Sequence, residues 1–117
     1  FKNVNDTYGH QIGDEVLIEF ASILQTNLRK TDYVGRLGGE EFIVICPEST
    51  IAEVTDLMEV FREKIENHTF KSIKNKTASF GVTISKQGDS VDSLIKRADK
   101  ALYEAKNSGR NKVLVNT

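Results

Sequence analysis

The sequence predicts one domain of the α/β or α+β class, with helices that cover a mixed β-sheet. Three segments carry apolar residues at the spacing of an amphipathic helix, and short strand-like stretches lie between them. The 117 residues are enough for one hydrophobic core but not for two. The predicted order is helix, two strands, helix, strand, helix, strand, with no internal repeat or linker.

The first predicted helix runs from about Asp14 to Lys30. Such a helix must bury its apolar stripe, so we expect it to pack on the sheet. The stripe consists of Leu17, Phe20, Ala21, Leu24 and Leu28.

Two strands, Tyr33–Leu37 and Phe42–Cys46, are predicted to flank a turn at Gly38 and Gly39. Glycine adopts positive φ without steric cost, which suits a tight hairpin. The second strand is an unbroken apolar run, so we expect it to be buried on both faces. Pro47 ends it.

The second half of the chain repeats the alternation of helix and strand. A helix is predicted from about Thr50 to Asn67, and a strand with alternating apolar residues over 78–85, where Gly81 indicates a close backbone approach. A third helix is predicted to start at a cap formed by Asp89 or Ser90. It ends at a glycine, residue 109, and a short strand over residues 113–115 follows.

Composition narrows the classes of function. Charged residues make up 28% of the chain and the net charge is -1, so we expect no broad attraction to nucleic acid or to an anionic membrane. No apolar run approaches the ~18 residues of a membrane span, and no signal peptide is recognisable. The single cysteine, Cys46, lies in an apolar run and is predicted to be a small core residue. A cytoplasmic setting fits these features.

Two adjacent carboxylates at the glycine turn are the strongest chemical signal. The backbone amides of Gly38 and Gly39 can approach a phosphate group, and Glu40 and Glu41 can hold a hard cation such as Mg²⁺ against it. The alternative is an ordinary hairpin whose glutamates keep a sheet edge soluble. These five residues alone leave both interpretations open.

With its neighbours included, the segment Arg36–Phe42 resembles the signature loop of GGDEF domains, the diguanylate cyclases, in the variant with Glu at the third position. Three further segments match the family in order and spacing, and the resemblance spans essentially all 117 residues. They are Phe1–Asp6, then Gly9-His10 with Gly13-Asp14, and Lys106–Asn111.

The resemblance implies a ferredoxin-like, palm-type core shared with nucleotide cyclases. In that family a central strand precedes the motif that begins here at Phe1, and it carries an aspartate that binds metal. We therefore expect residues 1–117 to be a GGDEF domain that is incomplete at its N-terminus, with the first strand missing. A sensor domain is expected upstream, and membrane anchoring of the full-length protein stays open.

The implied reaction condenses two GTP molecules into cyclic di-GMP and two pyrophosphates with Mg²⁺ or Mn²⁺. Each domain binds one GTP, so catalysis implies a homodimer. By motif match, Glu40 is the general base and a metal ligand, Glu41 is a second metal ligand, and Lys2 stabilises the transition state. With the upstream aspartate absent, two-metal catalysis by this fragment is an open question.

The resemblance also implies a GTP pocket. Gly38, Gly39, Lys106 and Arg110 would contact the phosphates, and the guanine site would be formed by Asn5, His10, Asp14 and Leu17. Each residue has an ordinary alternative. The cations would be solvated surface residues, the aspartate a helix N-cap, and the histidine an exposed loop residue.

Arg29 and Asp32 match the family's RxxD inhibitory motif, six residues before Gly38. Arginine and aspartate together can bond the edges of guanine, which suits cyclic di-GMP as product and inhibitor. The alternative is a simple ion pair at the end of a helix. Either Arg62 or an arginine of another chain would complete this site.

Two other classes of function remain open at this point. One is a catalytically silent GGDEF-type module that binds GTP or cyclic di-GMP. The other is an unrelated α/β domain with a decorative hairpin. In all three cases we expect no nucleic-acid partner and no membrane contact by this domain.

Overall fold

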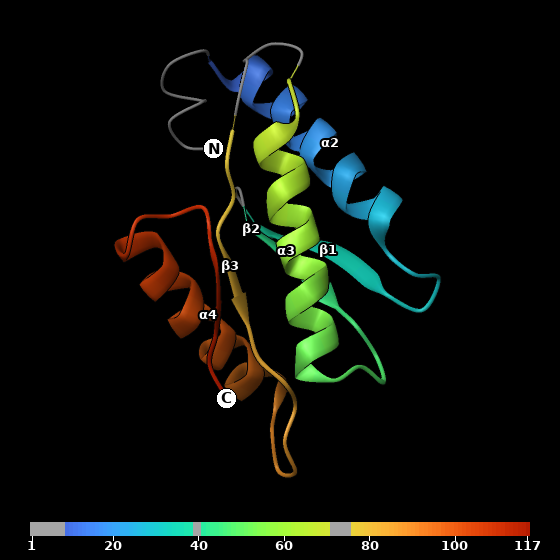
Figure 1. Cartoon of the computed structure of the whole chain (residues 1–117), viewed down its shortest axis with the longest axis vertical. Helices are drawn as coiled ribbons and strands as arrows, with labels where there is room; N and C mark the ends of the chain where they lie inside the picture. Colours follow the sequence, from blue (N-terminus) through green and yellow to red (C-terminus); the bar gives the residue numbers. More distant parts are fainter. Residues whose placement is uncertain (1–8, 39–40, 71–75) are drawn as a thin grey trace. The chain divides into compact units, whose positions relative to one another are not determined.

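The computed structural model describes residues 9–38, 41–70 and 76–117. The predicted order of helices and strands and the mixed α/β class are confirmed. The chain divides into two compact units, which are described in turn: Phe1–Pro47 with Asn67–Lys76, and Glu48–Glu66 with Thr77–Thr117. The elements (Figure 1) are α2 (His10–Asn27), β1 (Tyr33–Gly38), β2 (Glu41–Ile45), α3 (Ile51–Asn67), β3 (Phe80–Val82), α4 (Val91–Asn107) and β4 (Val113–Val115).

Helix α2 dominates the first unit and begins four residues before the predicted start. Gly9, with a φ of 93°, precedes the helix and offers no capping side chain, so the usual sequence signal for a helix start is missing. The helix ends at Asn27, where the backbone N–H of Leu28 donates to the carbonyl of Gln25 at 3.4 Å. Its buried side chains are Val16, Leu17, Phe20 and Leu24.

Strands β1 and β2 form an antiparallel hairpin beside α2. Tyr33 pairs with Ile45, and the register shifts between Arg36 and Gly38, which produces a bulge next to the turn. The ring of Phe42 lies 5.2 Å from that of Phe20, centroid to centroid, so α2 covers the face of the hairpin that carries Phe42.

The prediction that the second strand is buried on both faces is wrong. Glu41 and Ile45 at its ends are exposed, and the three residues between them are half-buried. Tyr33 and Ile45 are 65% and 52% exposed and share the face opposite to Phe42. A continuous apolar run therefore does not show how many faces of a strand are buried. Successive side chains point to opposite faces, and a face is buried only where another element covers it.

The second unit is built on a parallel pair of strands. Phe80 of β3 pairs with Val113 of β4, and α4 packs against both strands (Figure 1). A Cβ atom on Gly81 would lie 2.5 Å from the backbone nitrogen of Leu102 and would also meet the carbonyl of Ala98. The predicted close backbone approach at Gly81 is therefore confirmed, and α4 is the element that approaches.

Strand β3 is shorter than the predicted stretch over 78–85. The residues that flank it have other partners. The hydroxyl of Ser79 accepts from the backbone N–H of Asn111, and the Thr83 hydroxyl and the Ile84 carbonyl accept from the side chain of Arg97. Polar alternation predicted these residues as strand, but their hydrogen-bonding groups are used elsewhere.

Side-chain caps define the starts of α3 and α4. Thr50 and Glu53 form reciprocal hydrogen bonds between side chain and backbone at 3.2 and 3.1 Å ahead of α3. At α4, Ser90 is the N-cap and exchanges such bonds with Ser93. Of the two predicted caps, Ser90 is correct, and Asp89 instead bonds Arg97.

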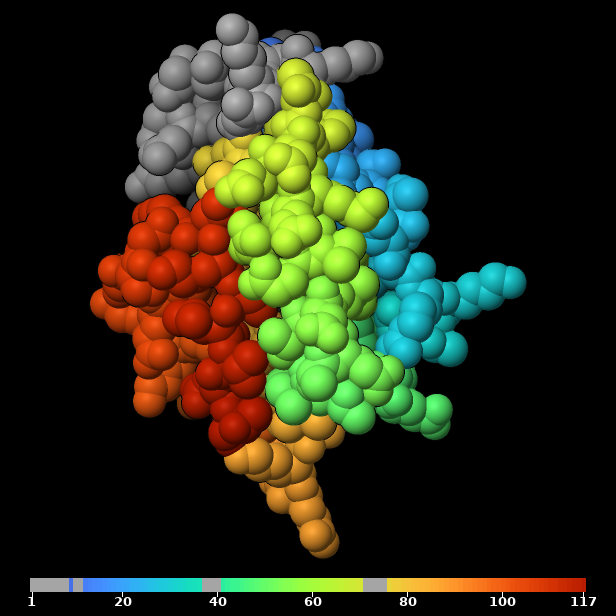
Figure 2. Space-filling model, in the orientation of Figure 1, coloured from blue at the N-terminus to red at the C-terminus, as the bar shows by residue number. Residues whose placement is uncertain are grey.

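The connection between β3 and α4, orange in Figure 2, projects into solvent. Arg97 holds its base by donating hydrogen bonds to the Thr83 hydroxyl and the Ile84 carbonyl, both at 2.7 Å, and to the Asp89 carboxylate. The Arg97 guanidinium keeps the pKa of the Asp89 carboxyl well below its usual range. This loop is therefore tied to α4 at the point where it leaves β3.

The apolar core of the second unit lies where α3 and α4 bury their stripes. Phe61 is fully buried, with its ring 6.4 Å from that of Phe80. The other buried members are Met58, Ile65, Val82, Ala101 and Ala105. Across residues 9–38, 41–70 and 76–117, no helix combines the length and hydrophobicity needed to cross a bilayer.

Candidate functional site

The glycine turn of the hairpin places one candidate metal ligand at the surface. Glu41 is exposed at the first position of β2, opposite Gly38 and beside the bulge. Successive strand residues point to opposite faces, so adjacent carboxylates can reach one cation only where the turn distorts the pleat, and the bulge is such a distortion. Gly39 and Glu40 lie outside the described residues, so their predicted roles remain predictions.

The donor chemistry at this turn fits a hard cation. A solvent-facing carboxylate is the oxygen ligand that Mg²⁺ and Mn²⁺ prefer. In the described part of the chain no group of three or more His, Cys, Asp or Glu side chains could hold a metal ion by itself. Glu41 is therefore the described half of the predicted pair with Glu40.

Asp14 lies in the second turn of α2 and is exposed. Because the helix begins at His10, Asp14 cannot be its N-cap, so the ordinary alternative for this residue is wrong. Leu17, one turn further on, is only 7% exposed and belongs to the core. The side chain of His10 lies outside the described residues, as do Lys2 and Asn5.

The loop between α4 and β4 carries the two predicted phosphate-binding cations. Lys106 is half-buried in the last turn of α4, and Arg110 is exposed. Gly109, Arg110 and Asn111 all have positive φ, at 116°, 60° and 49°. A left-handed conformation costs a non-glycine residue about 1–2 kcal/mol, so other contacts must hold this loop.

Asn111 is the residue that holds it, a role that motif matching did not assign. Its backbone N–H donates to the Ser79 hydroxyl at 3.1 Å, and its side-chain oxygen accepts from Arg62 at 3.2 Å. Its side-chain nitrogen donates to Glu66. The available signal was its place at the end of the Lys106–Asn111 segment, since asparagine tolerates positive φ better than most residues.

Arg62 is thereby engaged within its own unit. Its Nε donates to Glu59 at 3.0 Å, and Nη1 lies 3.8 Å from a carboxylate oxygen of Glu66. Only 18% of its side chain is exposed. These contacts tie Arg62 to α3 and to Asn111, and whether it also completes the predicted regulatory site stays open.

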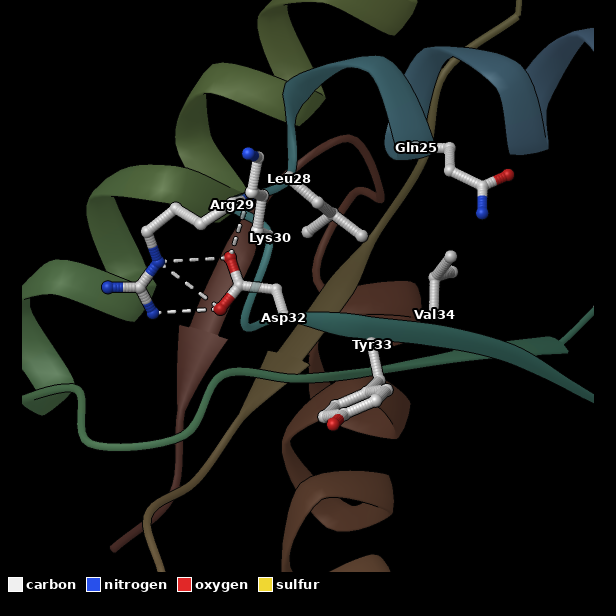
Figure 3. Close-up of a pocket in the computed structure, with 7 residues that line it drawn as sticks. All are labelled: Gln25, Leu28, Arg29, Lys30, Asp32, Tyr33 and Val34. Carbon is white, nitrogen blue, oxygen red and sulfur yellow. Dashed lines mark hydrogen bonds and ion pairs between the residues drawn. The ribbon is translucent and has the colours of Figure 1, made fainter.

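Arg29 and Asp32 meet in the turn between α2 and β1. Asp32 accepts hydrogen bonds from the backbone N–H of Arg29 at 3.0 Å, from Nε at 3.1 Å and from Nη2 at 2.8 Å (Figure 3). Its side chain is fully shielded from solvent, whereas that of Arg29 is 48% exposed. The hydrogen bond from Arg29 lowers the pKa of the Asp32 carboxyl despite burial.

A pocket of about 350 Å³ opens at this turn. Figure 3 shows the side chains of Gln25, Leu28 and Val34 on one side of β1 and the ring of Tyr33 on the other. The lining of the pocket consists of Gln25, Leu28, Arg29, Lys30, Asp32, Tyr33 and Val34.

The ion pair that was the ordinary alternative for this segment is formed between Arg29 and Asp32, and a pocket whose lining includes Arg29 and Lys30 lies beside it. A cyclic di-GMP site at this pocket stays a prediction. The carboxylate faces Arg29, and the half-exposed guanidinium is the part of the pair that solvent reaches.

Comparison with known proteins agrees with these observations. The family model for the diguanylate cyclase GGDEF domain matches residues 1–112. The response regulator PleD of Caulobacter vibrioides is 44% identical over 120 residues, which cover 97% of this chain and 26% of PleD. The diguanylate cyclase DgcM of Escherichia coli is 43% identical over 114 residues, covering 97% of this chain and 28% of DgcM.

Solved structures give the same answer for the fold. The active GGEEF domain of a diguanylate cyclase from Vibrio cholerae has a TM-score of 0.90 at 31% identity and covers 99% of this chain and 76% of that one. The GGDEF domain of DgcB from Caulobacter crescentus, in complex with c-di-GMP, has a TM-score of 0.89 at 35% identity. The match covers 97% of this chain and 70% of that one. The predicted palm-type cyclase fold is confirmed.

The curated relatives are much longer proteins, and the chain spans about a quarter of the length of PleD and DgcM. The match nevertheless extends over nearly all of this chain, from residue 1 to residue 112, which directly precedes strand β4. The chain belongs to the GGDEF domain family of diguanylate cyclases.

Proposed function

We propose that residues 1–117 form a GGDEF domain that condenses two GTP molecules into cyclic di-GMP and two pyrophosphates, with Mg²⁺ or Mn²⁺ as cofactor. The observation that carries this proposal is the exposed carboxylate of Glu41 opposite Gly38 at a bulged glycine turn. The Vibrio cholerae neighbour is an active domain with the same GGEEF variant of the signature, which supports competence over silence.

Glu41, with Glu40, would hold the divalent cation that neutralises the triphosphate charge and activates the attacking hydroxyl. The amides of Gly38 and Gly39 would donate to phosphate oxygens, since no Cβ atom blocks the approach. Glu40 would accept the proton of the 3′-hydroxyl as general base.

Asp14 would select guanine. Its carboxylate is exposed, and N1–H and N2–H of guanine are adjacent donors that one carboxylate can accept. Leu17 would contribute apolar surface at the base of this site, and Asn5 and His10 would complete it. Helix capping does not occupy this carboxylate, because α2 begins at His10.

The leaving pyrophosphate would be bound by Lys106 and Arg110, and Lys2 would stabilise charge in the transition state. The Arg110 backbone is held in the left-handed region by the hydrogen bond of its N–H to the Ala105 carbonyl at 2.9 Å. Backbone strain of this kind is frequent at ligand sites, where it fixes a side chain's direction.

One domain binds one GTP, so two copies would face each other and each 3′-hydroxyl would attack the partner's α-phosphate. Cyclic di-GMP would then act back on the pocket at Arg29 and Asp32 as a product inhibitor. The complex of the DgcB domain with c-di-GMP supports binding of this dinucleotide by the family's fold.

The second candidate function is a silent module that binds GTP or cyclic di-GMP without turnover. The pocket beside the Arg29–Asp32 ion pair favours it, because binding there would not require the metal ligands of the glycine turn. This candidate predicts ligand binding with no product.

The deciding experiment incubates the protein with GTP and Mg²⁺ or Mn²⁺ and separates the nucleotides by chromatography. We expect cyclic di-GMP from the parent, and a loss of at least about 100-fold in turnover for Glu41→Gln, since a metal-bound carboxylate supports several kcal/mol of charge stabilisation. Glu48→Gln, on an exposed turn, is the control with the same change of charge. GTP binding without product in the parent would favour the silent module.

A further inference from the structure

The loop between α4 and β4 is anchored to three elements of its own unit. The backbone N–H of Arg110 donates to the Ala105 carbonyl of α4 at 2.9 Å, and the N–H of Phe80 in β3 donates to the Lys112 carbonyl, also at 2.9 Å. Among the described residues, the hydrogen bonds between this loop and α3 all come from the Asn111 side chain. Asn111 is therefore the residue that ties this loop to α3.

The two α3 side chains that bond Asn111 carry opposite charges. Its Oδ1 accepts from Nη1 of Arg62 at 3.2 Å, and its Nδ2 donates to a carboxylate oxygen of Glu66. Arg62 is itself held, because its Nε donates to Glu59 at 3.0 Å and only 18% of its side chain is exposed. A primary amide carries one acceptor and one donor group, so it satisfies both partners, whereas a carboxylate of the same size cannot donate to Glu66.

Arg110, directly before Asn111, is exposed, and its guanidinium has no hydrogen-bond or ion-pair partner in the described part of the chain. Both residues have positive φ, at 60° and 49°, which an L residue adopts only where surrounding contacts hold it. The direction of a side chain depends on the backbone that carries it. The contacts of Asn111 therefore influence where the Arg110 guanidinium points.

We propose that Asn111 is a positioning residue for the binding of a nucleoside triphosphate. By tying the loop to α3, it holds the Arg110 guanidinium in one direction before the ligand arrives. The outer phosphates of the triphosphate are the group that this guanidinium binds, through paired N–H donors. The inference deepens the proposed phosphate-binding role of Arg110 and rests on it.

Loss of the Asn111 side chain removes no direct contact with the ligand, so its effect is one of order. Without the amide, the loop has more freedom between its backbone anchors, and Arg110 samples more directions in the ligand-free protein. Binding must then order the loop, and the lost entropy lowers the affinity. Asn111→Gly isolates this effect from backbone strain, because glycine adopts positive φ freely.

Two nucleotides separate positioning from a general loss of structure. The α,β-methylene analogue of GTP cannot release pyrophosphate, and GMP lacks the two outer phosphates. In calorimetric titrations with Mg²⁺, we expect Asn111→Gly to bind the analogue about fivefold more weakly than the parent, and to bind GMP within about twofold of it. Asn111→Asp should show the same pattern without the added freedom of glycine, because it keeps the acceptor for Arg62 but sets a carboxylate against Glu66.

Asn116→Gly is the matched control. The Asn116 side chain also makes a structural hydrogen bond, to the Arg97 carbonyl at 3.0 Å, but it lies outside this loop. We expect this variant to bind both nucleotides within about twofold of the parent, even if its melting temperature falls.

A double-mutant cycle tests whether Asn111 acts through Arg110. Arg110→Ala should bind the analogue about tenfold more weakly or worse, because it removes charge-assisted hydrogen bonds. In that background, Asn111→Gly should change the affinity by no more than about twofold, because no guanidinium is left to position.

The outcomes distinguish this inference from the function on which it rests. If Arg110→Ala weakens the analogue but Asn111→Gly and Asn111→Asp bind it like the parent, the inference alone fails. It also fails if the Asn111 variants lose GMP and the analogue equally, or if Asn111→Gly has its full effect in the Arg110→Ala background. If Arg110→Ala binds the analogue like the parent, the proposed phosphate-binding role of Arg110 fails, and the positioning role fails with it.

Discussion

The buried charge of the described chain is concentrated in one residue. Asp32 is the buried polar or charged residue within the described ranges, and its carboxylate is compensated by Arg29 from the same turn. The sequence predicted the pair from its three-residue spacing but not the burial of one member. Burial depends on β2 lying across from the turn, a contact that spacing within one segment cannot reveal.

Asn111 shows the same limit of prediction from sequence, here for a structural role that the motifs did not assign. Motif matching assigned ligand roles to Lys106 and Arg110 but none to the residue after them. Its bonds to Ser79, Arg62 and Glu66 reach segments more than thirty residues away. Only the folded chain brings those partners together, so a residue that acts by tying segments has no local signature.

Asp14 gives the residue-scale prediction. Asp14→Asn replaces an acceptor-only group by one that presents donors to the donors of guanine, so we expect the dissociation constant for GTP to rise about tenfold or more. The melting temperature should barely change, since the residue is exposed inside a helix.

Glu15→Gln is the matched control, because it makes the same change of charge one residue away on an exposed position. Calorimetry with GTP measures both variants. Equal GTP affinity of parent and Asp14→Asn would remove Asp14 from the guanine site, and equal losses in the two variants would indicate a general charge effect.

For helices and strands, the accuracy of the prediction from sequence depended on whether the residues that determine the feature lie within the element itself. Helices α3 and α4 start close to the predicted residues, and their caps, Thr50 and Ser90, act within one turn. The start of α2 at His10 was not predicted, because Gly9 carries no capping side chain. The burial of β2 was mispredicted because the partners of a strand face come from other elements.

Gly81 gives the first prediction at this scale. A Cβ atom there meets backbone atoms of α4 at Ala98 and Leu102, which cannot rotate away as a side-chain end could. We expect Gly81→Ala to destabilise the protein by about 1–3 kcal/mol and to lower the melting temperature by about 4 °C or more.

The hairpin offers the control for that change. A Cβ atom on Gly35 would meet only the Cγ2 atom of Ile43, at an ordinary distance of 3.8 Å. Gly35→Ala should therefore leave the melting temperature within about 2 °C of the parent. Calorimetric melts compare the two, and equal effects would mean that the close approach of α4 to β3 does not matter for stability.

The Arg97–Asp89 pair at the start of α4 predicts a pH dependence. The pKa of the Asp89 carboxyl is lower in the folded than in the unfolded state. The ionised carboxylate therefore contributes its full stabilisation above the unfolded pKa of about 3.9, and this contribution is lost progressively as the pH falls below that value. Asp89→Asn should lower the melting temperature near neutral pH, and the gap to the parent should narrow at about pH 3.

Asp92→Asn is the control for that experiment, since it removes an exposed acidic residue in the first turn of the same helix. Its gap to the parent should be smaller near neutral pH. A gap for Asp89→Asn that stays constant with pH would show that the ionised carboxylate is not what Arg97 stabilises.

For the whole molecule, the sequence predicted family and fold well because its motifs are distributed over the full length of the chain, from Phe1–Asp6 to Lys106–Asn111. The proposed site is harder to predict, because its residues belong to segments far apart in the sequence and no one motif sets their arrangement.

Feedback by the product is the prediction that involves the whole molecule, because the ligand is proposed to bind at the α2–β1 turn and the rate reports on the proposed cyclase site. Arg29→Ala removes the half-exposed guanidinium and leaves the shielded Asp32 carboxylate without its partner. We expect the concentration of cyclic di-GMP that halves the initial rate to rise about tenfold or more.

Arg62→Ala tests the other arginine of this chain that the sequence offers for the regulatory site. Its guanidinium is engaged by Glu59, Glu66 and Asn111, so we expect a lower melting temperature but the parent's inhibition curve. Initial rates measured against added cyclic di-GMP compare parent and both variants. Relief of inhibition by Arg62→Ala would assign that arginine to the regulatory site. Coincident curves for Arg29→Ala and the parent would leave the Arg29–Asp32 pair as a structural ion pair. A ligand that makes no differential contact with the turn cannot transmit feedback through it.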